Sequence, residues 1–273
     1  MSNEPESAPQ ERVISLQAIS QNFLGAVQRQ FDLLSYNLAA AQQVSAENYE
    51  NFAHLVKIMP VGQLHQNFAL VRDYARELLV RQTLNDLVNM SAACMDNCHL
   101  LCLLIREQDP SKPAGGAVAE DVQKRVQERQ NAFARASLNE KFEALERDFG
   151  IMCGTEDALI ALAIGLRSLV VRDGEVTKED VNEDEELVFE FKTVQVIAPP
   201  ADAAPDKKPE VRVVDTRRTF RVGDRIELSN SELLGLSVTV TAFFHDLFQS
   251  VDDFGTKTLG KKPAAGAAAA SGQ

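Results

Sequence analysis

Apolar residues in the first part of the chain recur three and four positions apart, which is the spacing of one face of an amphipathic helix. The series is Val13, Leu16, Ile19, Phe23, Val27, Phe31, Leu34 and Leu38. We therefore expect helix from about residue 12, with a stop at Pro60, because proline cannot continue a helix. A second long helix is expected from about Gln63 to Ile105. Its middle is apolar nearly all round, which predicts a central position in a bundle.

Prolines and glycines between residues 107 and 121 interrupt this pattern. Charged helical segments follow, and Gly150 is expected to terminate one of them. A further helix is expected to begin at Thr155 as N-cap and to end at Asp173 and Gly174. Acidic residues in its first turn favour that start.

Between about residues 187 and 228 the pattern changes to the alternation of apolar and polar residues that is typical of strands. Helical spacing then returns after Ser229 or Ser231. We predict a mainly α protein, a helical bundle with a small antiparallel β element inserted before the last helix. The predicted domain covers residues 12–254, and residues 1–11 and 255–273 are expected to be disordered tails.

Composition and charge narrow the choice of partners. The chain has 273 residues and a net charge of −12, which disfavours RNA or DNA binding because phosphate contacts need a basic face. Its N-terminus lacks the apolar core of a secretion signal, and no run approaches the roughly 18 apolar residues of a membrane span. We expect a cytoplasmic location and no membrane contact.

The stretch from Ala161 to Val176 carries the most informative residues. It contains arginine, a polar residue, a short apolar stretch and then a turn with glycine, and it resembles the HEPN-like helical proteins. The resemblance covers roughly residues 160 to 250. It implies a ribonuclease site in which an arginine and a histidine act on phosphate, a homodimer that pairs through its helices, and a role in stress response or defence against mobile elements.

The departure from the family pattern concerns the histidine. Arg172 occupies the position where histidine is expected, and no histidine occurs between Arg167 and His245. Histidine suits proton transfer because its pKa lies near neutral pH, whereas arginine keeps its proton. Cleavage of RNA by the family's mechanism is therefore not expected.

Two interpretations of the arginines remain open. In one, Arg167 pairs with an acidic residue inside the bundle or across a dimer, and Arg172 supports the C-terminus of its helix. In the other, the helix frays at Val171, and Arg167 and Arg172 converge on an anion. Arg167, Ser168 and Arg172 are accordingly the candidate residues for binding an anion or a partner.

These considerations lead to three hypotheses. The first is a non-catalytic, dimeric HEPN-like binding or scaffolding protein. The alternative is a divergent, metal-independent ribonuclease in which Arg167 stabilises charge and a distant histidine acts as the base. Of His54, His65, His99 and His245, we favour His245, because its helix is expected to return to the bundle. The third is a structural helical protein unrelated to the family.

The cysteines and the charged segments have simpler interpretations. Cys94 and Cys102 lie about 12 Å apart along a helix, too far to share one metal with Cys98. We expect these cysteines to pack as small apolar residues, and we expect no metal or cofactor. The acidic run from Lys178 to Glu186 is expected to be a solvated loop. The basic segment Arg212–Arg225 is expected to pair with this acidic run rather than to bind nucleic acid.

Overall fold

The computed structural model describes residues 14–55, 67–107, 120–197 and 209–260. These residues form seven helices and one antiparallel pair of strands, in the order α1 (Leu16–Gln43), α2 (Ala46–Leu55), α3 (Phe68–Glu107), α4 (Glu120–Arg135), α5 (Leu138–Phe149), α6 (Glu156–Val171), β1 (Glu186–Ile197), β2 (Glu210–Arg221) and α7 (Asn230–Leu259). The predicted fold class, a helical bundle with a small antiparallel β element before the last helix, is confirmed.

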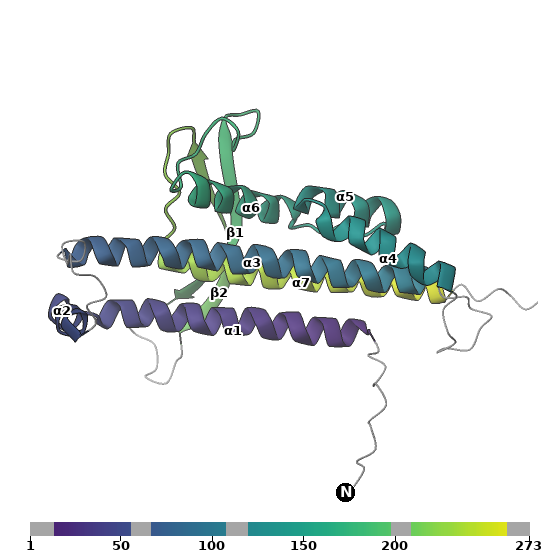
Figure 1. The fold of residues 1–273 in the computed structure, drawn as a ribbon, viewed down its shortest axis with the longest axis horizontal. Coiled ribbons are helices and arrows are strands. Elements are labelled where there is room, and N and C mark those ends of the chain that lie inside the picture. Colours follow the sequence, from purple (N-terminus) through teal and green to yellow (C-terminus); the bar gives the residue numbers. More distant parts are fainter. Residues whose placement is uncertain (1–13, 56–66, 108–119, 198–208, 261–273) are drawn as a thin grey trace, which may run out of the picture.

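Helix α3 lies at the centre of the bundle, as its apolar character predicts. It packs against α1 and α7 on one side and against α4, α5 and α6 on the other (Figure 1). Leu84 and Leu87 of α3 are fully buried, as are Phe243 and Phe244 of α7. Long helices that share buried side chains in this way stabilise one another by removing apolar surface from water.

Among the described helices, α3 alone is long and apolar enough, by length and composition, to cross a membrane. This differs from our expectation that no segment has that character. The expectation rested on uninterrupted apolar runs, whereas α3 mixes apolar residues with small and uncharged polar ones. The central helix of a bundle passes the same test.

The two strands form a hairpin whose register pairs Glu186 with Arg221 and Ile197 with Glu210. Strand β1 packs on α7 and α6, and β2 lies beyond it. Odd-numbered residues of β1, such as Phe189 and Phe191, point into the core and are buried. The alternation that predicted the strands is thus the alternation of core-facing and solvent-facing side chains.

Two glycines allow the helices to approach β1 closely. A Cβ at Gly235 of α7 would lie 2.2 Å from the carbonyl oxygen of Lys192, and a Cβ at Gly165 of α6 would lie 2.4 Å from Cζ of Phe189. A larger residue at Gly235 would push α7 away from the main chain of β1, and a larger residue at Gly165 would displace either α6 or the buried ring of Phe189. The position of α6, which carries Arg167, therefore depends on Gly165.

Several predicted boundaries change. Helix α7 continues past residue 255, where the C-terminal tail was expected to begin, because Phe254 packs on the core and Gly255 is buried. Thr155 precedes α6, but its hydroxyl makes no capping hydrogen bond. Most of both predicted tails and the predicted stop at Pro60 lie outside the described residues.

Candidate functional site

The C-terminus of α6 places the two arginines of the resemblance. The helix ends at Val171, and the amide N–H groups of Arg172 and Gly174 both donate to the carbonyl oxygen of Ser168, over 2.9 and 3.0 Å. Asp173 and Gly174 adopt positive φ values of 50° and 88°. This turn reverses the chain, so that the following loop runs back beside the last turn of α6.

The loop after α6 is held by main-chain hydrogen bonds to the segment that follows β2. Val176 N–H donates to Asp224 O over 2.9 Å, and Ile226 N–H donates to Gly174 O over the same distance. Val176 and Ile226 are buried. The loop is therefore anchored on both sides, and it presents its next residues to the arginines.

Asp180 is the centre of the site. Its Oδ2 accepts hydrogen bonds from the N–H of Thr177 over 2.9 Å and from the Thr177 hydroxyl over 2.8 Å. This local turn fixes the carboxylate, and the Asp180 side chain is completely buried, with 0% exposure. A buried carboxylate requires charged or polar partners because its removal from water is costly.

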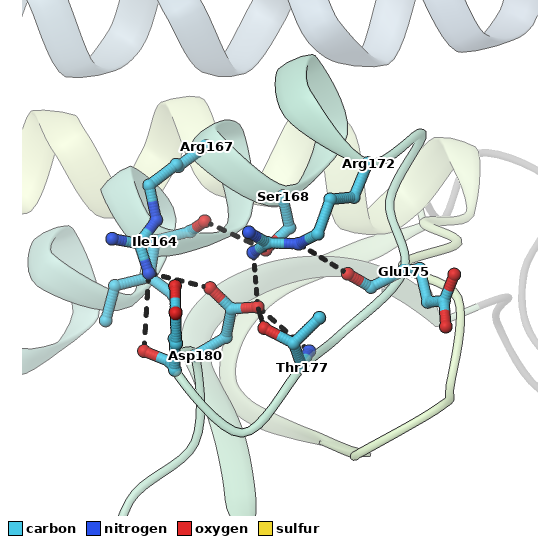
Figure 2. A network of polar contacts seen from close by, with 8 residues as sticks. Ile164, Arg167, Ser168, Arg172, Glu175, Thr177 and Asp180 are labelled. Atoms are coloured by element: carbon cyan, nitrogen blue, oxygen red, sulfur yellow. Dashed lines mark hydrogen bonds and ion pairs between the residues drawn. The ribbon is translucent and has the colours of Figure 1, made fainter.

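Both arginines supply those partners (Figure 2). Arg167 Nη2 lies 2.9 Å from Asp180 Oδ1, and Arg172 Nη2 donates to Asp180 Oδ2. Arg167 also donates to the carbonyl oxygen of Glu179 over 3.3 Å. The Arg167 side chain keeps 50% exposure and that of Arg172 keeps 23%. The two arginines thus converge on one carboxylate that belongs to the chain itself.

Ser168 and Glu175 complete the surroundings of Arg172. Arg172 Nη2 donates to Ser168 Oγ over 3.1 Å, and its Nε donates to Glu175 O over 3.4 Å. The Ser168 hydroxyl donates to Ile164 O over 3.3 Å and is buried. Ser168 is therefore a positioning residue for Arg172, and it does not itself reach solvent.

The electrostatics of Asp180 follow from this geometry. Burial alone would raise the pKa of the carboxyl, but the hydrogen bonds from Arg167, Thr177 and Arg172 outweigh burial and hold the pKa well below its usual range. Asp180 is therefore ionised at neutral pH. A carboxylate with so low a pKa is a poor general base, because an efficient base has a pKa near the working pH.

The structure distinguishes the two interpretations of the arginines. Arg167 does pair with an acidic residue, although that residue lies in the following loop and not in the bundle. Arg172 caps the end of α6 and also binds Asp180. The convergence expected for an external anion occurs, and Asp180 takes the place of the anion.

The histidines are not brought to the arginines within the part of the chain that the structure describes. His245 is exposed on α7, and no hydrogen bond or ion pair joins it to Arg167. His99 is buried in α3, where its ring stacks on Phe133 at 3.8 Å. The side chains of His54 and His65 lie outside the described residues.

Asp180 was missed by the sequence analysis, which placed it in a solvated acidic run. The run is exposed at Glu183, Asp184 and Glu185, but Asp180 is buried. One local signal was present, because Thr177 and Asp180 stand three residues apart, the spacing at which a side chain closes a turn on the main chain. The arginine partners depend on tertiary structure and left no local signal.

The cysteines pack as predicted. Cys94, Cys98, Cys102 and Cys153 are buried and carry free thiols. Burial raises the pKa of Cys102 and of Cys153 to about 12, so both remain protonated and unreactive. Within the described ranges, no group of three or more histidine, cysteine or acidic side chains is placed to hold a metal ion.

The basic segment pairs with acidic residues, but only one of its four described pairs is with the acidic run. Arg221 Nη2 lies 3.4 Å from Oε1 of Glu186, which is the last residue of the acidic run. The other pairs are Arg212 with Glu210, Arg218 with Glu232 and Arg225 with Glu77. Most of its acidic partners thus come from outside the acidic run. Paired arginines offer less positive charge to a nucleic acid than free ones.

Comparison of the chain with models of known families, with curated proteins and with solved structures returns no match.

Proposed function

We propose that this protein is a non-catalytic HEPN-like binding or scaffolding protein that acts as a homodimer. The observation that carries the proposal is the engagement of Arg167 and Arg172 by the buried carboxylate of Asp180. Arginines that are paired inside the chain act as structural supports of the site. The resemblance suggests stress response or defence against mobile elements as the cellular context.

Phosphate chemistry by this site is disfavoured on two grounds. The first is charge, because Asp180 engages both guanidiniums and offsets one of their two positive charges, which leaves less charge to stabilise a transition state. The second is proton transfer. Asp180 has too low a pKa to act as the base, and no imidazole is hydrogen-bonded to Arg167 or Arg172 in the described residues.

The surface beside the arginines suits a protein partner. Val170 and Val171 at the end of α6 are 55% and 67% exposed, and the half-exposed Arg167 lies three and four residues before them, on the same face of the helix. Protein interfaces have an apolar core and are enriched in arginine, and this end of α6 supplies side chains of both kinds. We therefore assign partner binding to this end of α6, with Ser168 and Arg172 as its internal supports.

An RNA cleavage assay tests the catalytic alternative. The purified full chain is compared with Arg167→Ala and His245→Ala, with and without a chelator. We expect no cleavage by any of the three. Cleavage that is lost in both variants and unaffected by the chelator would establish the metal-independent ribonuclease instead.

The binding assignment is tested by capture of protein partners from a cell extract on the immobilised chain. Val171→Asp places a charge in the exposed apolar surface and should lose any specific partner. Val222→Asp, at another exposed valine, is the matched control and should keep it. Equal capture by both variants would remove the end of α6 from the proposal.

A further inference from the structure

The main-chain contacts of β1 show which main-chain groups of β2 point to its outer edge, away from β1. Lys192 in β1 donates its main-chain N–H to Thr239 Oγ1 over 2.8 Å, and its carbonyl oxygen faces Gly235. Both groups point to α7 and away from β2. In an antiparallel pair, residues whose main-chain groups point outward stand opposite one another. Asp215, which is the partner of Lys192 in the register, therefore presents its N–H and C=O to the outer edge of β2.

The same alternation applies along the strand. The main-chain N–H and C=O groups also point to the outer edge at Val211, Val213, Arg217 and Thr219. Arg221 confirms it at the end of the strand, since its N–H donates to Asp224 Oδ2 over 2.7 Å and its C=O accepts from Asp224 N–H over 2.9 Å.

The edge groups before Arg221 are unpaired in the described part of the chain. No hydrogen bond there involves the main-chain N–H or C=O of residues 211, 213, 215, 217 or 219. Strand β2 is 12 residues long and is exposed along most of its length. An edge of this kind is a template for pairing with another strand.

The charges on the solvent face of the hairpin alternate in sign. Lys192 Nζ lies 2.8 Å from Asp215 Oδ1, and Glu190 stands opposite Arg217 in the register. Asp215 and Arg217 are two residues apart, so they lie on the same face of β2. A second β2, running antiparallel and placed so that Asp215 meets Arg217 of the other copy, makes two equivalent ion pairs by symmetry.

We propose that two copies of this chain pair through the outer edges of β2, with Asp215 opposite the partner's Arg217. The two hairpins then form one four-stranded antiparallel sheet. Across this sheet, the solvent face carries in order Lys192, Asp215, the partner's Arg217 and the partner's Glu190. The sign of the charge alternates from each of these residues to the next. The inference rests on the dimeric part of the proposed function. It places the pairing at β2 and uses no residue of α6, whereas the resemblance implies pairing through the helices.

The neighbouring positions fit the same register. Val213 stands opposite the partner's Thr219, which places β-branched side chains together. Thr216 stands opposite the partner's Thr216 on the two-fold axis. A slip of two residues would instead place Asp215 against the partner's Asp215, and like charges directly opposite one another are destabilising. This self-complementarity favours a second copy over an unrelated strand.

Charge reversal tests the pairing by sedimentation velocity on the full chain. Asp215→Lys and Arg217→Asp each place like charges opposite one another in their own homodimers, so each should weaken self-association by about tenfold or more. Mixed in equal amounts, the two variants should form a heterodimer, because the introduced lysine meets the introduced aspartate and the native Arg217 meets the native Asp215. Restoration on mixing also shows that both variants are folded.

The matched controls carry the same charge changes elsewhere. Asp73→Lys in α3 and Arg29→Asp in α1 are exposed and lie outside β2, so both should keep the dissociation constant of the native chain. A native chain that stays monomeric overturns the inference and also the dimeric part of the proposed function. A native dimer that is unaffected by both β2 variants, but dissociated by Val171→Asp, overturns the inference alone and assigns pairing to α6.

A disulfide test fixes the register. Opposite residues in a non-hydrogen-bonded antiparallel pair have Cα atoms about 4.5 Å apart, close enough for a disulfide. Thr216→Cys should therefore give a covalent dimer on mild oxidation. Val214→Cys should not, because its two copies would be about 14 Å apart. A covalent dimer from Val214→Cys without one from Thr216→Cys would overturn the proposed register, and the buried native thiols give a low background.

Discussion

Arg167 and Asp180 form a 2.9 Å ion pair across a turn, thirteen residues apart in the chain. Arg172 binds the other carboxylate oxygen of the same residue. The exposed end of α6 therefore depends on a buried charge in the loop that follows it. We expect that charge to contribute to stability, to make the site sensitive to acid and to keep external anions from the two arginines.

The Asp180 carboxylate should contribute strongly to the stability of the fold. Asp180→Asn removes the negative charge and leaves two arginines without their counter-ion. Hydrogen bonds to charged groups contribute about 1.5–3 kcal/mol each, so we expect the free energy of unfolding to fall by about 3 kcal/mol. Asp184→Asn, an exposed carboxylate in the same acidic run, is the control and should change it by less than about 0.5 kcal/mol. Chemical denaturation measures both changes, and equal losses of unfolding free energy in Asp180→Asn and Asp184→Asn would contradict the central role of Asp180.

The same variant should gain an anion site. With Asp180 neutral, Arg167 and Arg172 can bind inorganic phosphate between them. Phosphate should then raise the melting temperature of Asp180→Asn more than that of the native chain, because a ligand stabilises the state that it binds. The triple variant that also carries Arg167→Ala and Arg172→Ala should lose this extra shift. A phosphate effect of the same size in all three proteins would exclude a site at these arginines.

Acid should remove the stability that Asp180 supplies. The folded-state pKa of Asp180 lies below its unfolded value of about 3.9, so its contribution is fully present above that value. It is lost as the pH falls toward the folded pKa, because the unfolded chain then binds a proton that the folded chain does not. The difference in unfolding free energy between the native chain and Asp180→Asn should therefore be constant from pH 5 to 7 and should shrink below about pH 4. A constant difference down to pH 2 would refute the assignment.

His99 should give a second pH dependence, in a different range. Burial lowers the pKa of His99, and this outweighs the hydrogen bond from Nδ1 to Gln130 Oε1, which would raise the pKa. The folded chain therefore keeps His99 neutral, and stability should fall as the pH drops below the unfolded value of about 6.5, by at most about 1.4 kcal/mol per pH unit. His99→Phe, which can still stack on Phe133, should remove this loss between pH 6.5 and 5, whereas His245→Asn should retain it.

The close approach of α7 to β1 gives a test by mutation. Gly235→Ala places a methyl group 2.2 Å from the Lys192 carbonyl oxygen, so α7 and β1 must separate. We expect a loss of about 2–3 kcal/mol in the free energy of unfolding, as for overpacked cores. Gly25→Ala in α1 meets only the end of Arg29, at 3.7 Å, and should be neutral or stabilising by up to about 1 kcal/mol. Coincident thermal melts of Gly235→Ala and Gly25→Ala would contradict the close contact between α7 and β1.

The fold was largely predictable because its signals are local. The helical spacing of Val27, Leu34 and Leu38, which are seven and four residues apart, gave α1, and all three are buried. Alternation gave both strands, in which Phe189 and Phe220 are buried on the core-facing side. Gly150 ends α5 at a φ of 68°, the left-handed conformation that glycine favours.

The site was less predictable because its partners come from tertiary structure. Arg167 and Arg172 were selected by resemblance, but Asp180 was assigned to solvent because its neighbours are charged. Thr155 has a preferred N-cap side chain, yet its hydroxyl makes no hydrogen bond and Glu156 accepts from Cys153 N–H instead. In each case tertiary packing fixes the position of the side chain and overrides the preference of the local sequence.

The central position of α3 has a consequence for synthesis of the protein. Its apolar side chains are covered partly by α7, the last helix in the described chain, which also packs on α1 and β1. During translation, α1 and α3 emerge long before residues 230–259 leave the ribosome. Their apolar faces are then open to chaperones and to one another, so the bundle can close only after translation of α7 is complete.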